Sequence, residues 1–183
     1  MDIEQESKII RRILSGDHEA YALLVENYKG PVYNLAYRLT GRHQDEEDLA
    51  QEIFIRAFEA LERFNETKNF FPWLYTIALN VIRNHKKKKT PVPVRDIENP
   101  VFLNTTDGNE SLTSDEIVRR KQEAEILAVT IQKLPTPQQE AVVFRYYQEL
   151  TFEEIAHIQG VSLGAAKMRV YRGLKQLAEW MTK

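Results

Sequence analysis

The segment TFEEIAHIQGVSLGAAKMRVYRGLKQL, residues 151–177, decides the fold of the C-terminal part of this 183-residue chain. It opens with a capping box, because Thr151 is followed three positions later by Glu154. A short apolar helix then runs to Gly160, which predicts a turn, and Ser162 is placed to cap a second helix. Two short helices joined by a glycine turn are typical of a helix-turn-helix.

The second helix of this motif, residues 163–181, has a basic face that predicts DNA binding. From position 163 onward the chain carries five Lys or Arg residues and one acid. In a helix-turn-helix the second helix enters the major groove, where cations reach phosphates and base edges. A helical hairpin without DNA function shares the pattern and is the competing interpretation. The residues expected to contact duplex DNA are Ser162, Ala165, Lys167, Met168, Arg169, Tyr171, Arg172 and Lys175.

Further upstream, FFPWLYTIALNVIRNHKKKK (residues 70–89) predicts an amphipathic helix with a basic end. Its apolar stripe, at helical spacing, is Leu74, Ile77, Ala78, Val81 and Ile82. The opposite face carries Trp73, Thr76, Asn80, Asn84 and Lys87. An aromatic ring, amides and cations on one face suit single-stranded nucleic acid, whose bases stack and whose phosphates attract cations. A core helix with a solvated basic tail is the alternative.

Residues 45–64 predict the longest periodic helix, and one of its faces combines acids with an aliphatic residue. That face is formed by Asp48, Gln51, Glu52 and Ile55. An exposed aliphatic side chain among acids indicates a protein-docking surface, although a solvated face with one stray isoleucine fits the periodicity equally well. Paired carboxylates also bind metals or perform acid–base chemistry, but no histidine or second carboxylate cluster accompanies these. We therefore expect neither a metal site nor a catalytic site.

Glycine and proline divide the rest of the chain into shorter helical segments. Helices are expected at residues 6–15, 18–28, 32–39 and 115–134, and from 136 onward. Gly30-Pro31 is expected to separate the helix at residues 18–28 from the helix at residues 32–39. Thr136 is expected to be an N-cap, with proline at the first helical position and Gln139 at the third.

Two polar stretches connect these helices. Residues 65–69 (NETKN) precede a tryptophan, so this loop either holds an extruded base or is an ordinary helix connection. Residues 91–114 have no periodicity, contain Pro91, Pro93 and Pro100, and are net negative, which predicts a flexible linker. The sequence thus predicts an all-α protein of two small helical domains, residues 1–90 and 115–183.

Composition limits the classes of protein that fit. The chain has no cysteine, which removes disulfides, thiol catalysis and cysteine zinc sites and suits a reducing cytoplasm. No apolar run reaches the roughly 18 residues of a membrane helix, and the acidic N-terminus lacks the apolar core of a signal peptide. The net charge of −2 is unevenly distributed, because residues 83–89 carry five basic residues and no acid. That block and the basic C-terminal helix predict contact with phosphates.

Three segments in this order resemble a bacterial extracytoplasmic-function sigma factor. They are DEEDLAQEIFIRAF, FFPWLYTIALNVIRNHKKKK and LPTPQQEAVVFRYYQELTFEEIAHIQGVSLGAAKMRVYRGLKQL, with a proline-containing linker before the third. The resemblance covers nearly the whole chain. It implies a region 2-like domain at residues 1–90, a linker at 91–114 and a region 4-like helix-turn-helix domain at 115–183.

The resemblance also implies the partners and their sites. The face of Asp48, Gln51, Glu52 and Ile55 would bind the β′ clamp coiled coil of core RNA polymerase. The −10 promoter element would be read as a melted single strand by Asn65, Lys68, Asn69, Trp73, Tyr75, Asn80, Arg83, Asn84, Lys86 and Lys87. The basic C-terminal helix would read the −35 element as duplex, and its domain would approach the β flap. An anti-sigma factor is a further expected partner, whereas no cofactor, small-molecule substrate or nucleotide-hydrolysis loop is expected.

Two other functions compete with this one. A stand-alone helix-turn-helix regulator would use the N-terminal domain to sense a ligand or to dimerise, but it leaves the Asp48 and Trp73 faces unexplained. A metal-dependent nuclease would need converging carboxylates, whereas the acids here lie on one face of one predicted helix. The sequence therefore favours a transcription initiation factor that acts with core polymerase.

Overall fold

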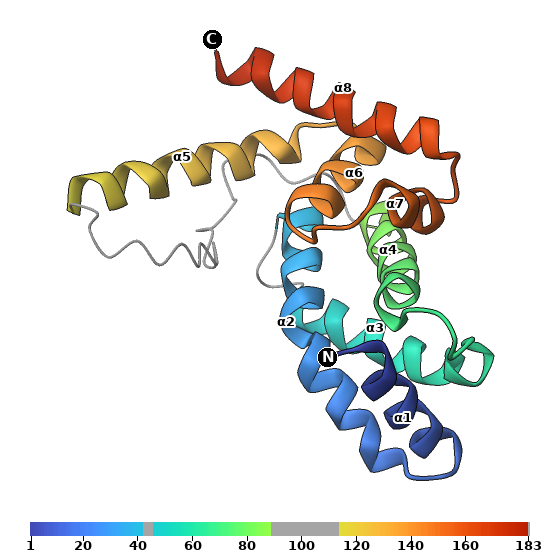
Figure 1. The fold of residues 1–183 in the computed structure, drawn as a ribbon. Coiled ribbons are helices and arrows are strands. Elements are labelled where there is room, and N and C mark those ends of the chain that lie inside the picture. The colour runs from blue at the N-terminus through green and yellow to red at the C-terminus, as the bar shows by residue number, and fades with distance from the viewer. Residues whose placement is uncertain (42–45, 89–113, 183) are drawn as a thin grey trace.

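The computed structural model describes residues 1–41, 46–88 and 114–182, which form helices joined by short loops, with no strand among them (Figure 1). The N-terminal half comprises α1 (Ile3–Leu14), the short 3-10 helix η1 (His18–Ala20), α2 (Tyr21–Thr40), α3 (Glu46–Ala60), the 3-10 helix η3 (Leu61–Arg63) and α4 (Phe70–Lys88). The C-terminal half comprises α5 (Ser114–Gln132), α6 (Thr136–Tyr146), α7 (Phe152–Gln159) and α8 (Leu163–Met181). The predicted all-α class with a C-terminal helix-turn-helix is confirmed. The predicted linker lies outside the described residues, except for Ser114, which begins α5.

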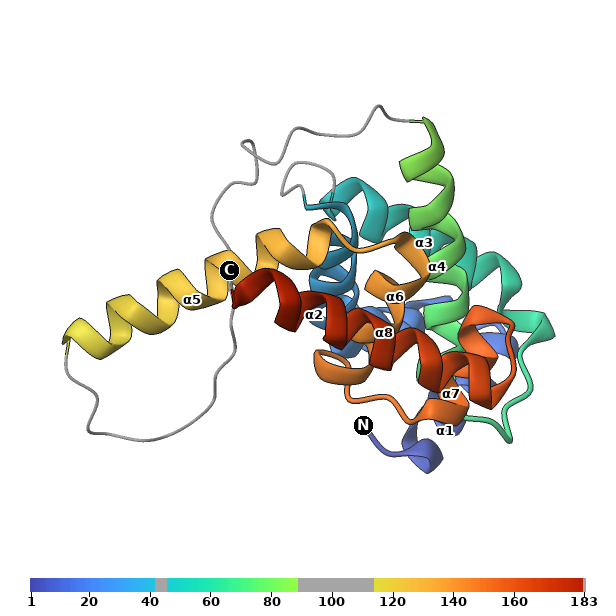
Figure 2. The same cartoon turned by 90° about the horizontal axis from the view of Figure 1, so that it is seen from above.

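The two halves pack against each other, while α5 projects from the body (Figures 1 and 2). Helix α4 lies against α7, and α2 contacts both α5 and α6. Buried apolar side chains of both halves belong to one cluster, which includes Leu35 and Leu74 from the first half and Phe144 and Ile155 from the second. The halves are therefore joined by a continuous core as well as by the chain.

Helix α2 corrects one prediction from the sequence. The expected break at Gly30-Pro31 is absent, because the helix continues through Pro31 to Thr40. Proline inside a helix removes a hydrogen bond and costs about 3 kcal/mol. Side chains on both sides of it are buried, including Leu24 before the proline and Leu35 after it, so packing against the core offsets this cost.

The start of α6 corrects a second prediction. Thr136 is the first helical residue rather than the N-cap, which is Pro135, and no side chain caps this helix. The Pro135 carbonyl accepts the N–H groups of Gln138 and Gln139 instead. The side chain of Gln139 is buried at 1% exposure and faces the N-terminal half, where it accepts a hydrogen bond from Lys86 at 2.9 Å.

Helices α6 and α8 pack closely at Gly173. A Cβ added there would lie 2.7 Å from Cγ2 of Val142, a side chain with 2% exposure. We expect Gly173→Ala to destabilise the protein by roughly 1–2 kcal/mol, because overpacking outweighs the gain in helix propensity. Urea unfolding measures this difference.

Gly164 in the same helix is the matched control for Gly173. A Cβ at Gly164 would meet nothing within 4 Å. Gly164→Ala is therefore expected to stabilise the protein by roughly 0.5–1 kcal/mol through helix propensity. Equal effects of the two substitutions would contradict the close packing at Gly173.

Candidate nucleic-acid interface

The helix-turn-helix of α7 and α8 is built by local signals. Thr151 caps α7 with a full capping box that includes the Glu154 side chain. Gly160 ends α7 at φ +65°, a left-handed conformation that favours glycine. The Ser162 side chain then accepts the N–H of Ala165 and caps α8. All of these positions agree with the sequence analysis.

Most of the residues expected to contact duplex DNA lie together on the outer face of α8. Ser162, Lys167, Met168, Tyr171, Arg172 and Lys175 are exposed, while Ala165 and Arg169 are half-buried. The opposite face of α8 buries Ala166, Val170 and Leu177 in the core. The described structure thus presents a helix face with cations, a thioether and a phenol to the solvent.

Two cations of this face are oriented by α7. Arg169 Nη1 donates to Gln159 Oε1 at 3.1 Å, and Lys167 Nζ lies 5.8 Å from the ring centroid of Phe152. The Phe152 ring also lies under the guanidinium of Arg145, at 5.1 Å. Because a cation over an aromatic face is attracted to it, Phe152 helps to hold the side chains of Lys167 and Arg145 in place.

The loop at residues 65–69 is closed by hydrogen bonds of its own. The Asn65 side chain accepts from the N–H and the hydroxyl of Thr67, and Lys68 donates its N–H to the Asn65 carbonyl at 2.9 Å. Asn69 accepts the N–H of Phe71 and so caps the start of α4. Asn65, Lys68 and Asn69 remain exposed, so this polar loop offers donors and acceptors to a ligand.

An aromatic cluster lies at the junction of the loop and α4. The Trp73 ring is 5.0 Å from Phe64 and 5.3 Å from Phe70, centroid to centroid. Phe70 is buried, whereas Trp73 is half-buried and so retains accessible surface. Further along α4, Asn80, Asn84 and Lys87 are exposed, as the sequence analysis expects. The loop and this side of α4 therefore combine stacking surface, amides and a cation.

The three other α4 residues expected to contact single-stranded DNA face the C-terminal half instead. Tyr75 is fully buried, packs on Phe144 and donates its hydroxyl to the side chain of Gln148, and burial raises its pKa. Arg83 and Lys86 are half-buried at the same junction. In this arrangement of the two halves, a DNA strand does not reach Tyr75.

A buried carboxylate holds Arg83. Glu140, at 1% exposure, accepts from Arg83 Nε at 2.8 Å and from Nη2 at 2.6 Å, and these hydrogen bonds raise the pKa of Arg83. Lys86 Nζ donates to the Leu39 carbonyl at 3.0 Å as well as to Gln139, and burial lowers its pKa. A bidentate pair between an arginine and a carboxylate is among the stronger polar contacts that proteins make.

The Glu140 carboxylate also connects Arg83 with α8. Its Oε2 accepts from Gln159 Nε2 at 3.1 Å, and the Oε1 of the same glutamine accepts from Arg169. The hydrogen-bonded chain therefore runs from Arg83 in α4 to Arg169 in α8. It joins one cation expected to meet the single strand with one expected to meet the duplex.

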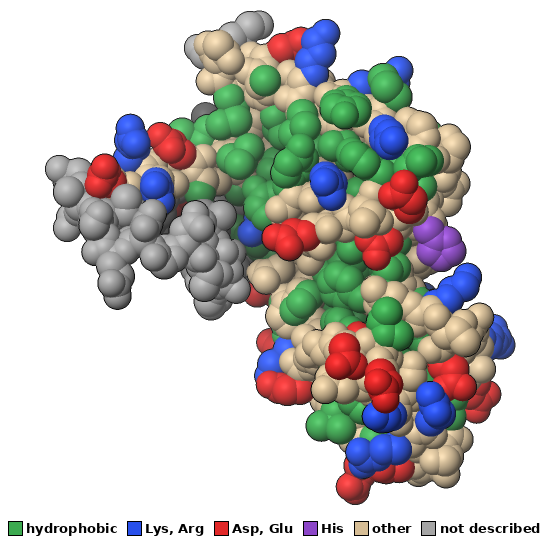
Figure 3. All heavy atoms as spheres, viewed as in Figure 1, with side chains coloured by type: hydrophobic (Ala, Val, Ile, Leu, Met, Phe, Trp, Pro, Cys, Tyr) green, Lys and Arg blue, Asp and Glu red, His purple; other side chains and the backbone are tan. Residues whose placement is uncertain are grey.

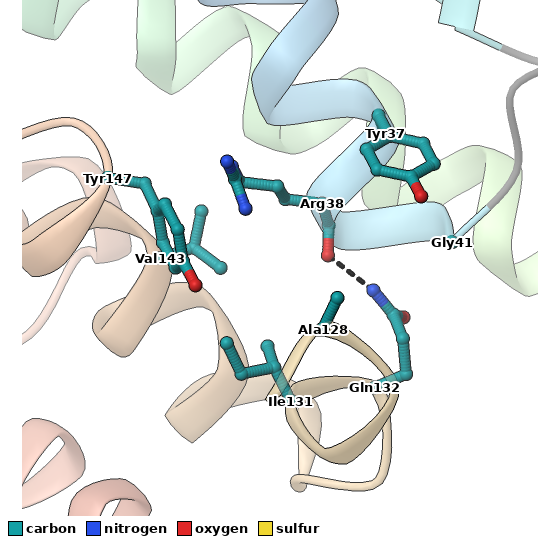
Figure 4. Close-up of a pocket in the computed structure, with 8 residues that line it drawn as sticks. All are labelled: Tyr37, Arg38, Gly41, Ala128, Ile131, Gln132, Val143 and Tyr147. Carbon is teal, nitrogen blue, oxygen red and sulfur yellow. Dashed lines mark hydrogen bonds between the residues drawn. The ribbon is translucent and has the colours of Figure 1, made fainter. Parts of the chain in front are cut away.

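A small pocket lies where α2, α5 and α6 meet (Figure 4). The Arg38 guanidinium lies over the ring of Tyr147, 3.6 Å from its centroid. Figure 4 shows the Arg38 carbonyl accepting a hydrogen bond from Gln132. Burial lowers the pKa of Arg38. The pocket is a feature of the contact between the two halves, since its lining comes from both.

The expected docking face lies on the exposed side of α3. Asp48, Gln51, Glu52 and Ile55 are all exposed, with Ile55 at 59%. Glu52 forms an ion pair with Arg56 at 2.6 Å, one turn along the helix. The buried side of α3 holds Leu49, Ile53 and Ala57. The four residues therefore form an accessible surface that mixes charge with an aliphatic side chain.

Exposed apolar side chains gather on the C-terminal half. Figure 3 shows them over α5, α6 and α8, in contrast to the mixed charges on the N-terminal half. The large exposed members in this half include Ile117, Val118, Ile126, Tyr146, Tyr171, Trp180 and Met181.

Among residues 1–41, 46–88 and 114–182, no cluster of three or more His, Asp or Glu side chains is placed to hold a metal ion. None of the helices in the described part of the chain is long and apolar enough to cross a membrane.

Sequence reasoning missed the residues that join the halves, namely Gln139, Glu140 and Gln148, and also the buried Glu6 of α1. Six consecutive side chains of α6, residues 139–144, are buried. Where a helix is buried on every side, no polar stripe marks an exposed face. The helical periodicity therefore gives no sign that Gln139 and Glu140 are buried and contact the N-terminal half.

Comparisons with known proteins agree with this geometry. The family described as Sigma-70 region 2 matches residues 24–91, and the family described as Sigma-70, region 4 matches residues 124–177. The ECF RNA polymerase sigma factor SigW of Bacillus subtilis (strain 168) is 34% identical over 179 residues, which cover 93% of each chain. The chain belongs to the ECF RNA polymerase sigma factors. In this ECF sigma factor the region 2 match contains α3 and α4, and the region 4 match contains α6 and α7.

Solved structures have the same fold as this ECF sigma factor. CnrH, in complex with the cytosolic domain of CnrY, matches with a TM-score of 0.72 over 96% of each chain, at 21% identity. The sigma factor RpoE from Bartonella quintana, in complex with the anti-sigma factor NepR, matches with a TM-score of 0.66 over 88% of this chain and 96% of that one, also at 21% identity.

Proposed function

We propose that this ECF sigma factor binds bacterial core RNA polymerase and reads a promoter at two places. The N-terminal half reads the −10 element as a melted strand, and α8 reads the −35 element as duplex. The observation that carries the proposal is the presence of two different reading surfaces in one chain. One is a polar loop over an aromatic cluster, which suits an unpaired base, and the other is a basic helix in a helix-turn-helix, which suits a major groove.

Each surface has a physical role in the proposal. Stacking of an unpaired base on an aromatic ring such as Trp73 contributes about 1–3 kcal/mol. A bidentate contact from an arginine to guanine contributes about 1–3 kcal/mol of discrimination. The α3 face binds the polymerase, whose fixed geometry sets the distance between the two DNA elements. The β flap is proposed as a second polymerase contact, made by the exposed apolar side chains of the C-terminal half.

Promoter reading requires the two halves to separate. Arg83 and Lys86 are bound by Glu140 and Gln139, and Tyr75 is buried between the halves. The arrangement described here is therefore closed with respect to the −10 strand. An anti-sigma factor is a proposed partner as well, because the matched RpoE structure holds such a factor.

Run-off transcription from a promoter library with purified core polymerase tests the proposal. We expect specific transcripts that depend on this protein, and only weak promoter binding by the protein alone. A protein that gives no specific transcript, and that binds a duplex site tightly without polymerase, would be a stand-alone regulator instead.

The exposed Arg172 of α8 yields a more specific prediction. Arg172→Ala is expected to lower −35 duplex affinity about tenfold, within the range expected for a single base or phosphate contact. Fluorescence anisotropy with the selected −35 duplex measures the change. Arg120→Ala is the matched control, because Arg120 is an exposed arginine on α5, outside the proposed reading face. An equal loss from both substitutions would indicate a general charge effect only.

A further inference from the structure

Helix α1 contains two polar residues with buried side chains, Glu6 at 4% exposure and Ser7 at 8%. Neither belongs to the docking face or to the surfaces proposed to read DNA. A buried carboxylate is costly unless hydrogen bonds compensate its lost hydration. The contacts of these two side chains therefore indicate what α1 does.

Both residues bind the segment that connects η3 with α4. The Ser7 hydroxyl donates to the Glu66 carbonyl at 2.9 Å, and Glu6 Oε2 accepts the N–H of Phe70 at 3.3 Å. Arg11 adds an ion pair with the Glu66 side chain at 2.8 Å, but the two side chains are 64% and 44% exposed and such pairs contribute little. Helix α1 thus holds the loop at residues 65–69 near its beginning and directly after its end.

Glu6 also fixes the first turn of α4. Phe70 is the first residue of that helix, so its N–H has no partner within the helix, and a negative charge there is favourable. The other carboxylate oxygen of Glu6 accepts from the Tyr28 hydroxyl. Tyr28 in turn packs on Phe70 and Phe71, each at 5.4 Å between ring centroids. One carboxylate therefore positions both the backbone and the rings at the start of α4.

These contacts bear on base recognition because the loop and the aromatic cluster meet at this point. The internal hydrogen bonds of Asn65 give the loop its shape, and α1 fixes that shape relative to Trp73. A site for one extruded base needs its donors and its stacking surface held within about 0.5 Å of the productive geometry. A loop free to move would lose discrimination between bases before it lost binding to the strand.

We propose that Glu6, assisted by Ser7, is a positioning residue for base selection in the −10 element, which it supports from the buried side of the loop without touching DNA. This inference rests on the proposed function. It assigns α1 a role in promoter specificity, although α1 lies outside the region 2 match that begins at residue 24.

The test uses full-length protein with bacterial core polymerase and a promoter library randomised through the −10 region. Sequencing the transcribed templates gives a base preference at each position, and an abasic substitution identifies the position at which the base is extruded. Glu6→Leu is expected to lower the preference at that position about tenfold and to leave preferences in the −35 element unchanged. Glu6→Gln keeps an oxygen that accepts the Phe70 N–H, so it is expected to retain most of the preference.

Two variants keep the test decisive. Glu4→Gln is the matched control, because Glu4 lies in the same helix and its side chain is 78% exposed in an ion pair with Lys8. Ser7→Ala removes a single hydroxyl and is expected to lower the base preference at the extruded position about threefold. This variant therefore tests the inference if the Glu6→Leu protein does not fold.

The outcomes separate this inference from the proposed function. Equal weakening of all positions, in the −35 element as well, would show that Glu6 only stabilises the fold. An unchanged preference in the Glu6→Leu and Ser7→Ala proteins would overturn the inference and leave the proposed function standing. A wild-type protein without specific initiation would overturn the proposed function and this inference together.

Discussion

Reversing the charge of Asp48 and Glu52 together is expected to abolish binding to core RNA polymerase. Both carboxylates are exposed on α3 beside Ile55, which is 59% exposed. Bringing like charges together at an interface costs several kcal/mol, which corresponds to a loss of roughly 100-fold or more in affinity. Co-purification of the Asp48→Lys/Glu52→Lys protein with core polymerase, and run-off transcription, measure the loss.

The fold should survive this double substitution, because neither side chain is buried. The one described contact that is lost is the Glu52–Arg56 ion pair, in which both side chains are about half exposed, so its contribution is small. Glu4→Lys/Glu26→Lys is the matched control, since each of these exposed acids pairs with a basic residue in its own helix, as Glu52 does. Normal co-purification of the Asp48→Lys/Glu52→Lys protein with core polymerase would contradict the proposal that this face binds the polymerase.

An apolar substitution separates charge from packing on the same face. Ile55 has no described partner in the core and is therefore available to a partner protein. Ile55→Ala is expected to lower the affinity for polymerase roughly tenfold, which is a smaller loss than charge reversal causes. The substitution removes apolar contact without adding repulsion.

The parts of the fold that depend on neighbours in sequence could be predicted from it. The helix-turn-helix follows from Thr151, Gly160 and Ser162, whose caps and turn involve residues only a few positions away. The shared exposed face of Asp48, Gln51, Glu52 and Ile55 was predictable for the same reason, because residues on one side of a helix recur at a known spacing. The continuity of α2 through Pro31 was not, since it depends on packing against helices distant in the chain.

Several contacts that shape the candidate site are long-range. Arg83 and Glu140 are 57 residues apart in the chain, and Tyr75 and Gln148 are 73 apart. Glu6 and Phe70 are 64 apart. No periodicity or local motif connects such pairs, so sequence reasoning placed Tyr75, Arg83 and Lys86 on a DNA-facing surface without the partners that cover them.

Removing the Glu140 carboxylate is expected to release the N-terminal half and to strengthen single-strand binding. Breaking a buried ion pair costs about 3–5 kcal/mol. The Arg83 side chain is 32% exposed, so water replaces part of the interaction that Arg83 loses with Glu140. We therefore expect Glu140→Ala to weaken the contact between the two halves by roughly 1–3 kcal/mol. If closure competes with the strand, Glu140→Ala raises affinity for a single-stranded −10 oligonucleotide by about 5- to 150-fold. The same change removes one of the two acceptors of Gln159 Nε2, which still donates to the Pro137 carbonyl at 3.1 Å, so the hydrogen bond from Arg169 to Gln159 is expected to remain.

Arg83→Ala separates closure from DNA contact. It breaks the same ion pair but also removes the cation proposed to meet the strand, so it should open the protein without raising strand affinity. The chain has no cysteine, so cysteines introduced at the exposed Glu19 and Glu179 give unique sites for a fluorescent donor and acceptor on the two halves. Energy transfer should fall in both variants and remain unchanged in Glu153→Ala, which removes an exposed carboxylate of α7. If Glu140→Ala left both energy transfer and strand affinity unchanged, the Arg83–Glu140 pair would not control access to α4.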